Sequence, residues 1–262
     1  MVTYLFDGTL TGLLTAVFES YASRQKAATL VPAAGYQPGF LDTAVTIIPD
    51  PEKAQRVWTG LGKRIGNAGR HEFYTVFLSE SAEAWQHMFG YARYIFDYDD
   101  HDGERAADYG NQHVLAVAAY AKKVSRERHR MKAFVRFNKS ADGLYTAIVE
   151  PDFNVLPLIA GHFRDRYADQ RWLIFDKRRH YGIYYDLTSV QEVKIEPVPA
   201  DAFQVATSAP MLPDENDSLY TSLWQEYFKS TNIKERANLK LHIQHVPKRY
   251  WKHLPEKEFG FL

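Results

Sequence analysis

The sequence predicts an α+β protein in which a central antiparallel sheet, with a ββαββ core, is flanked by N-terminal and C-terminal helices. Apolar residues recur at helical spacing in the first and last thirds of the chain. In the middle third the period changes to two, which is typical of strands. An Asp-Gly pair at 142–143 separates two of these alternating runs and indicates a tight hairpin.

The length of the chain favours a single domain. Its 262 residues fall in the size range, up to about 250 to 300 residues, in which one hydrophobic core keeps growing. With 45% hydrophobic and 24% charged residues, the chain has enough apolar surface to fold. We therefore expect one domain over residues 1–262, with a helical and mixed part at 1–110, the ββαββ core at 111–187 and a helical extension at 214–262.

Capping residues and periodicity define the individual elements. Before the core we expect a strand at 3–6, a helix capped by Asp7 or Thr9, a loop at 24–42, a strand at 43–48, a helix from Asp50 to about residue 65, and a helix from Ser79 to about residue 96. From the core onward we expect a helix at 111–128, strands at 131–137 and 144–149, a helix at 155–167, strands at 171–176 and 181–186, an irregular segment at 189–213, and helices from about residue 218.

Charge is balanced over the whole chain but not along it. The chain has 32 Lys and Arg against 32 Asp and Glu. Three windows, 122–139, 164–180 and 229–253, hold 21 Lys or Arg and 5 Asp or Glu, a net charge of +16. This segregation predicts a basic face that binds a polyanion, because such attraction depends on where the charges lie. Solvated faces paired with the acidic remainder of the chain are the alternative interpretation.

The candidate nucleic-acid-binding residues lie in these windows. On a strand at 131–137, Lys132, Phe134 and Arg136 would share one face and place cations beside a ring, as in single-strand-binding proteins. A Phe134 ring half covered by another element is the alternative. The full candidate set comprises Arg126, Arg128, Arg130, Lys132, Phe134, Arg136, Lys177, Arg178, Arg179, Lys248 and Arg249.

A second hypothesis is a DNA-acting hydrolase, either a nuclease or a glycosylase-like enzyme. Such chemistry needs clustered carboxylates, or a histidine beside a water molecule. The candidate catalytic group comprises His129, Glu150, Asp152 and His162. We expect no metal site, since His242 and His245 have no third ligand at helical spacing. A third hypothesis is a protein-interaction scaffold that uses the aromatic-rich C-terminal segment.

The absence of cysteine excludes several classes of protein. A disulfide framework, a thiolate zinc site, a cysteine nucleophile and a cysteine-ligated iron–sulfur cluster cannot be carried by this chain. We expect no cofactor, so a partner would supply any redox chemistry. The first residues do not read as a signal peptide, and no run approaches the ~18 apolar residues of a membrane span. We therefore expect a cytoplasmic protein without membrane contact.

Four runs of the sequence resemble a known bacterial family. They are YLFDGTLTGLLTAVFESY at 4–21, RERHRMKAFVRF at 126–137, EPDFNVLPLIAGHFRDRYADQRWLIFDKRRHYGIYYD at 150–186 and HVPKRYWKHLPE at 245–256. The family is that of the probable DNA metabolism proteins, a domain of unknown function. The resemblance implies a radical-SAM protein encoded nearby as partner. Some members are fused to a uracil-DNA-glycosylase-like domain, and this chain resembles the stand-alone form.

The charge pattern and the resemblance together favour one function. We expect a nucleic-acid-binding accessory protein in DNA repair or modification that presents single-stranded or distorted DNA to the radical-SAM enzyme. The resemblance implies no catalytic residues, so the hydrolase and the scaffold stay open as alternatives.

Overall fold

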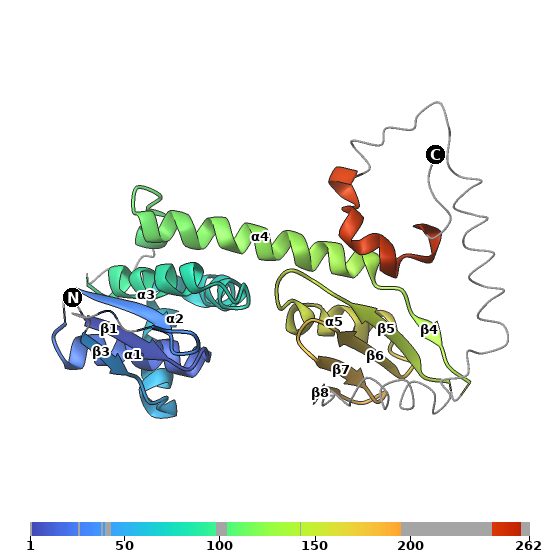
Figure 1. The fold of residues 1–262 in the computed structure, drawn as a ribbon, viewed down its shortest axis with the longest axis horizontal. Helices are drawn as coiled ribbons and strands as arrows, with labels where there is room; N and C mark the ends of the chain where they lie inside the picture. The colour runs from blue at the N-terminus through green and yellow to red at the C-terminus, as the bar shows by residue number, and fades with distance from the viewer. Residues whose placement is uncertain are drawn as a thin grey trace. The chain divides into compact units, whose positions relative to one another are not determined.

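The computed structural model confirms the α+β class, with helices and strands in two compact units (Figure 1). It describes residues 2–257 except 26, 38, 40–42, 98–103, 142 and 195–242. The two units are Met1–Arg126 and Glu127–Leu262, so their boundary falls inside a helix. The prediction of one domain over residues 1–262 stays a prediction.

A three-stranded parallel sheet organises the first unit. Its strands are β1 (Val2–Phe6), β2 (Ala28–Pro32) and β3 (Thr43–Thr46), with β1 in the centre. Val2 pairs with Ala28 on one side and with Thr43 on the other. β2 lies inside the predicted loop at 24–42, so that part of the prediction is wrong. The prediction treated Pro32 as a loop residue. A proline is tolerated at the end of an edge strand, because its missing N–H interrupts no hydrogen bond between strands there.

Helices α1 and α2 begin at the predicted caps. Before α1 (Leu10–Ala22), the Thr9 hydroxyl oxygen accepts a hydrogen bond from the Gly12 N–H at 2.9 Å. Before α2 (Pro51–Phe77), Asp50 accepts bonds from two N–H groups of the first turn. α2 passes its predicted end because Gly66, with a φ of 68°, only kinks the chain before the helix resumes.

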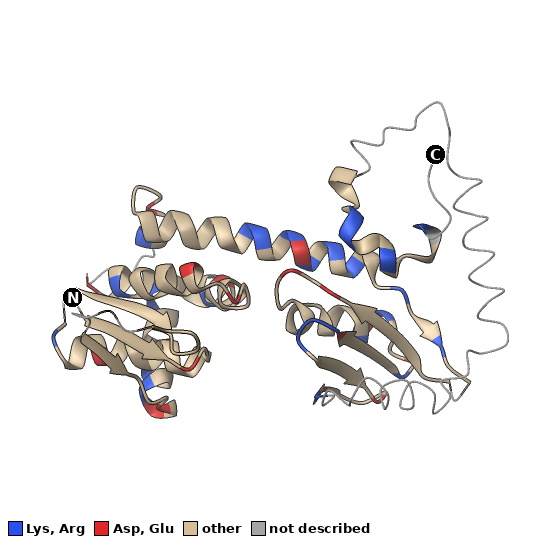
Figure 2. Cartoon of the chain, in the orientation of Figure 1, with Lys and Arg blue, Asp and Glu red and all other residues tan. Residues whose placement is uncertain are grey.

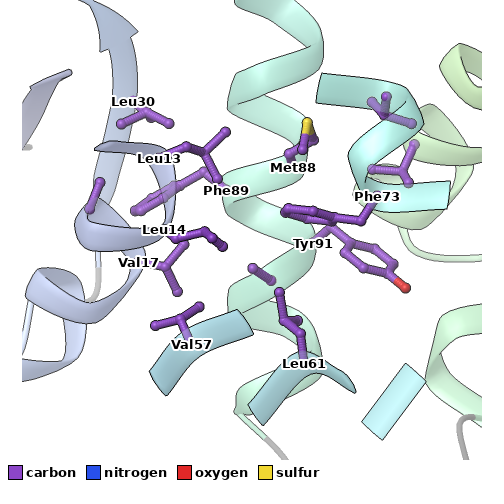
Figure 3. Close-up of a cluster of buried hydrophobic side chains, with 14 of the residues drawn as sticks. Leu13, Leu14, Val17, Leu30, Val57, Leu61, Phe73, Met88, Phe89 and Tyr91 are labelled. Carbon is purple, nitrogen blue, oxygen red and sulfur yellow. The ribbon is translucent and has the colours of Figure 1, made fainter. Parts of the chain in front are cut away.

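Helices α1, α2 and α3 (Ala82–Phe96) bury one hydrophobic core against the sheet of the first unit. Ser81 caps α3, two residues after the predicted Ser79, and a short 3-10 helix, η1 (Glu104–Ala107), follows. Figure 3 shows side chains from α1, β2, α2 and α3 meeting in this core: Leu13, Leu14, Val17, Leu30, Val57, Leu61, Phe73, Met88, Phe89 and Tyr91.

Helix α4 (Gln112–Phe134) overturns the strand predicted at 131–137. The residues that alternate there also continue a helical stripe, since Val124, Met131 and Val135 are all buried at i, i+7 and i+11. The N–H of Val135 donates to the carbonyl of Met131 at 3.2 Å, as in a helix. The single-strand platform predicted for this segment is therefore wrong, because its residues point around a helix and not to one face of a strand.

The second unit contains a five-stranded sheet with the strand order β4-β5-β6-β7-β8. The strands are β4 (Asn138–Lys139), β5 (Tyr145–Val149), β6 (Trp172–Asp176), β7 (Tyr181–Tyr185) and β8 (Val190–Lys194). The sheet is mixed and not purely antiparallel, because β5 and β6 run parallel while the other three pairs are antiparallel. Helix α5 (Leu156–Arg166) is the crossover that makes the parallel pair possible.

The order β4, β5, α5, β6 and β7 matches the predicted ββαββ, although β4 is a two-residue strand that lies just after the range predicted for the first strand. β8 is an addition, since the segment 189–213 was predicted to be irregular. One face of the sheet packs on α5, where Trp172 of β6 and Phe163 of α5 are buried with their ring centroids 6.2 Å apart. This packing fixes the crossover helix, and with it the loops at both of its ends.

The C-terminal segment that the structure describes forms two 3-10 turns, η3 (Lys248–His253) and η4 (Pro255–Lys257). Tyr250 and Leu254 are each 2% exposed, and the Tyr250 ring lies 5.3 Å from that of Phe134. Most of the predicted helical extension at 214–262 lies outside the described residues. In the part that is described, Tyr250 and Leu254 belong to the core of the second unit.

Candidate functional site

Three segments of the second unit meet at the carboxyl ends of the parallel strands β5 and β6. They are the loop 150–154 after β5, the turn 177–180 after β6, and η3. Loops that follow parallel strands commonly form the ligand sites of α/β units, because they come together at one edge of the sheet. Figure 2 shows Lys and Arg gathering on the last turns of α4 and on η3 beside it.

Glu127 of α4 is the buried centre of this cluster, with a side chain that is 2% exposed. Its Oε1 accepts a hydrogen bond from the Asp152 N–H at 2.9 Å. Its Oε2 accepts from the Tyr250 hydroxyl at 2.5 Å and from the Arg249 guanidinium at 3.0 Å. Burial and the bond to Glu127 raise the pKa of the Tyr250 phenol, so it stays a donor. Glu127 therefore ties α4, the loop after β5 and η3 together.

Three arginines converge on Asp152. Arg178 and Arg179 donate to its backbone carbonyl at 3.4 and 3.1 Å, and Arg249 pairs with its carboxylate at 2.7 Å. Arg179 also pairs with the fully buried Asp176 at 2.9 Å. The same carboxylate accepts bonds from the N–H groups of Arg178 and Arg179, which shapes the turn after β6. The guanidinium groups are thus held in position within the chain itself.

Glu150 pairs with two side chains of η3. Lys252 Nζ lies 2.5 Å from one of its carboxylate oxygens, and His253 Nε2 lies 3.7 Å from the other. The hydrogen bond from Lys252 lowers the pKa of Glu150, and the charge of Lys177 contributes. Burial lowers the pKa of His253 even though Glu150 acts in the opposite direction, so the neutral imidazole is favoured.

The structure brings five of the predicted nucleic-acid-binding residues together in this cluster. Besides the three arginines around Asp152, Arg130 lies 3.8 Å from the Glu127 carboxylate, and Lys177 is close enough to Glu150 to affect its pKa. All three basic windows of the sequence therefore contribute to one place in the second unit. The cluster also contains four carboxylates, which charge counting along the sequence did not anticipate: Glu127, Glu150, Asp152 and Asp176.

Two predicted residues have structural roles at the end of α4. The Arg136 guanidinium donates to the carbonyls of Ala133 and Val135, which closes the helix end. Phe134 packs on Tyr250, so the alternative of a partly covered ring describes it better than a stacking platform. Neither role requires a ligand.

The remaining predicted cations lie outside the contacts around Asp152. Arg126 is exposed and Arg128 half-buried on α4, and Lys132 of the same helix lies near His162. Lys248 is exposed at the start of η3, with its Nζ 5.9 Å from the centre of the Trp251 ring.

The structure does not bring together the four residues predicted as the catalytic group of a hydrolase. Glu150 and Asp152 lie in the cluster, but η3 holds each of them in an ion pair. His129 is exposed on α4, and His162 lies against Phe163, with a pKa that burial and the charge of Lys132 lower. Among the residues that the structure describes, no contact joins either histidine to these carboxylates.

Five residues of the cluster were not among the candidate site residues: Glu127, Asp176, Tyr250, Lys252 and His253. One signal was available for Glu127, the only acidic residue of the window 122–139. It lies three residues after Val124 and four before Met131, on the apolar stripe of α4. A carboxylate at such a position is buried and needs partners, which predicts a polar network. His253 had no comparable signal, since only the fold brings it to Glu150.

The described residues contain neither a cluster of three or more metal-ligating side chains nor a membrane-spanning helix. No group of three or more His, Cys, Asp or Glu side chains that could hold a metal ion occurs among them, and His242 lies outside them. No helix in the same part of the chain is long and apolar enough to cross a membrane.

The fold and the cluster define an α+β protein with positioned arginines at the carboxyl end of a parallel strand pair. The family model of a domain of unknown function, DUF4130, matches residues 82–256, which is more than half of the chain. The chain belongs to this family, and the match runs from α3 into η4, so it includes the whole cluster. A comparison with curated proteins gives no match.

Proposed function

We propose that the chain binds nucleic acid through the arginine cluster around Asp152 and acts as an accessory protein in DNA repair or modification. The observation that carries this proposal is the convergence of Arg178, Arg179 and Arg249 from separate segments. The planar guanidinium group matches the geometry of a phosphate and donates two parallel hydrogen bonds to it. Positioned arginines lose less conformational freedom on binding, which favours affinity.

The balance of charge supports an anionic ligand. The cluster holds six Lys or Arg and four Asp or Glu: Arg130, Lys177, Arg178, Arg179, Arg249 and Lys252 against Glu127, Glu150, Asp152 and Asp176. Glu127 and Asp176 are buried and satisfied within the chain, whereas Lys177 and Arg178 are exposed. The surface that a ligand meets is therefore more cationic than the count alone indicates.

The partner in this proposal is a radical-SAM enzyme, as the family resemblance implies. A chain without cysteine provides no thiolate for an iron–sulfur cluster, so the redox chemistry belongs to the partner. The proposed role of this chain is to hold single-stranded or distorted DNA by its phosphates. The hydrolase has less support, because both carboxylates that could act as a general base are engaged in ion pairs. The scaffold has less support because Tyr250 and Leu254 are buried in their own unit.

Fluorescence anisotropy with labelled single-stranded DNA, from low to moderate salt, tests the proposal. The logarithm of the affinity should fall linearly with the logarithm of salt, by about 0.7 for each phosphate contact. The double variant Arg178→Ala, Lys248→Ala removes two exposed cations that lie beside the buried network, not at its centre. We expect it to bind more weakly and to lose about 1.4 from the salt slope.

The matched control is Arg164→Ala, on α5 of the same unit. Arg164 is exposed and pairs with its neighbour Asp165 at 2.9 Å, so its loss changes the total charge without touching the cluster. Its affinity should stay close to that of the wild type. Undetectable binding at low salt, an affinity that does not change with salt, or equal losses in both variants would contradict the proposal.

A further inference from the structure

Two histidines of the first unit face each other from different helices. Nδ1 of His87 on α3 lies 3.1 Å from Nδ1 of His113 on α4. The ring centroids are 5.3 Å apart, and the ring planes meet at 59°. Both residues are half-buried. The pair belongs to the first unit, and the proposed nucleic-acid function makes no use of it.

The separation of the two nitrogens fits a shared metal ion. Metal–imidazole bonds of about 2.0 to 2.1 Å place two nitrogens about 2.9 Å apart at a right angle and about 3.4 Å apart at the tetrahedral angle. The observed distance of 3.1 Å lies between these limits. A hydrogen bond between one protonated and one unprotonated Nδ1 fits the same distance, so the distance alone does not distinguish the two.

The backbone of α3 is shaped around the His113 ring. A Cβ atom on Gly90 would come within 2.4 Å of Cε1 and 2.5 Å of Nδ1 of that ring. A side chain at position 90 would have to displace the ring, and glycine avoids this at some cost to the helix. The backbone N–H of His113 donates to the Asn111 side chain at 2.9 Å, which caps the first turn of α4. The His113 ring therefore packs directly against the α3 backbone at Gly90.

The electrostatics of the His113 ring agree with this geometry. A ligand imidazole must be neutral. Burial lowers the pKa of His113, and the charge of His87 contributes in the same direction.

We propose that His87 and His113 form a site for a divalent transition-metal ion of the Zn²⁺, Ni²⁺ or Cu²⁺ class. Imidazole nitrogen suits these ions, and Cu²⁺ should bind most tightly. Across the residues that the structure describes, no third His, Cys, Asp or Glu completes the site. In this proposal water completes the coordination, and the ion links α3 to the first turn of α4. The open positions make the ion accessible to an exchangeable ligand.

Isothermal titration of the untagged, metal-free chain with Zn²⁺, Ni²⁺ and Cu²⁺ tests the site. We expect one ion per chain near neutral pH, an affinity that decreases as the pH falls below about 6.5, and a higher Tm with the ion present. His87→Ala and His113→Ala should each weaken binding by roughly tenfold or more, since a single imidazole forms no chelate. His129→Ala, an exposed histidine on α4, is the control and should bind like the wild type.

Gly90→Ala keeps both histidines but displaces the His113 ring, and its helical content, checked by circular dichroism, separates loss of the site from loss of the fold. A folded Gly90→Ala chain that binds the ion weakly supports the geometry. No binding to the wild type would overturn the proposal. Equal binding by the wild type and His87→Ala would also overturn it and leave an imidazole hydrogen bond only.

Discussion

At the scale of single residues, two buried carboxylates of the second unit, Glu127 and Asp176, need partners within the chain. Glu127 is 1% exposed and Asp176 is fully buried. The desolvation of a buried carboxylate costs several kcal/mol unless its oxygens accept hydrogen bonds. Removal of a single partner therefore lowers the stability of the fold strongly, because it leaves a buried charge uncompensated. Arg249 illustrates this, because it is both a proposed phosphate ligand and a partner of Glu127. A substitution of Arg249 would change DNA binding and folding together, so the DNA-binding test uses Arg178 and Lys248 instead.

Tyr250→Phe removes one partner of Glu127 without changing charge, together with the bond that the same hydroxyl accepts from Arg249. The variant removes a hydroxyl that donates to the buried carboxylate at 2.5 Å. We expect the free energy of unfolding to fall by about 1.5 to 3 kcal/mol, the usual range for a hydrogen bond to a charged group. Chemical denaturation measures it, with the exposed Tyr109→Phe as the neutral control. If both variants unfold like the wild type, Glu127 does not hold η3 in place.

Strand β7 is an interior strand of the second sheet, since it pairs with β6 on one side and with β8 on the other. A Cβ on Gly182 of this strand would lie 2.8 Å from the carbonyl oxygen of Ile174 and 3.4 Å from the Cα of Phe175. Backbone atoms of a paired strand cannot move away without loss of the ladder. Gly161 of α5 presents the opposite case, since a Cβ there meets no atom within 4 Å.

A pair of glycine variants tests this difference between elements. Gly182→Ala should lower the free energy of unfolding by about 1 to 3 kcal/mol, as overpacking does. Gly161→Ala should raise it by up to about 1 kcal/mol, since alanine favours the helix. Thermal unfolding of both variants measures the shifts in Tm. A Tm of Gly182→Ala equal to or above that of the wild type would show that the sheet accommodates the extra carbon.

At the scale of the whole molecule, histidines with a lowered pKa occur among the described residues of both units. They are His113 in the first unit and His162 and His253 in the second, and burial is the largest cause in each. The folded chain disfavours their protonation. Their contribution to stability is therefore complete above the unfolded pKa of about 6.5 and decreases as the pH falls through the lowered folded values. Carboxylates with a lowered pKa, such as Glu150, also stabilise the fold, and this contribution is lost only as the pH falls below about 4.5.

Acid unfolding should consequently begin with the histidines. Between about pH 7.5 and pH 5.5 we expect the denaturant midpoint of the wild type to decrease. The double variant His162→Gln, His253→Gln should show a smaller decrease, and the exposed His71→Gln should behave like the wild type. Urea unfolding at the two pH values measures the difference. A double variant with the full decrease would assign the effect to other groups.

The sequence predicted those parts of the fold that depend on neighbouring residues. The caps Thr9 and Asp50, the helix α5 and the order ββαββ all follow from capping groups or from a period within one segment. β2 and β8 were missed because their strand character comes from pairing with distant segments. The end of α4 was misread because its residues satisfy both a period of two and a helical stripe, and the burial of Met131 and Val135 favoured the stripe.

The same distinction holds for the site. The sequence by itself determined which cations the chain has, that they are segregated, and that no cysteine chemistry accompanies them. Only the tertiary structure decided which of them meet, since Arg249 and Tyr250 reach Glu127 across more than a hundred residues. The parallel pairing of β5 and β6 brings Asp152 close to Arg178. Because Glu127 and Asp176 are buried, their carboxylate oxygens need partners from the chain itself, such as Arg179 for Asp176. Charge along a sequence is a local property, whereas desolvation of a carboxylate depends on everything packed around it.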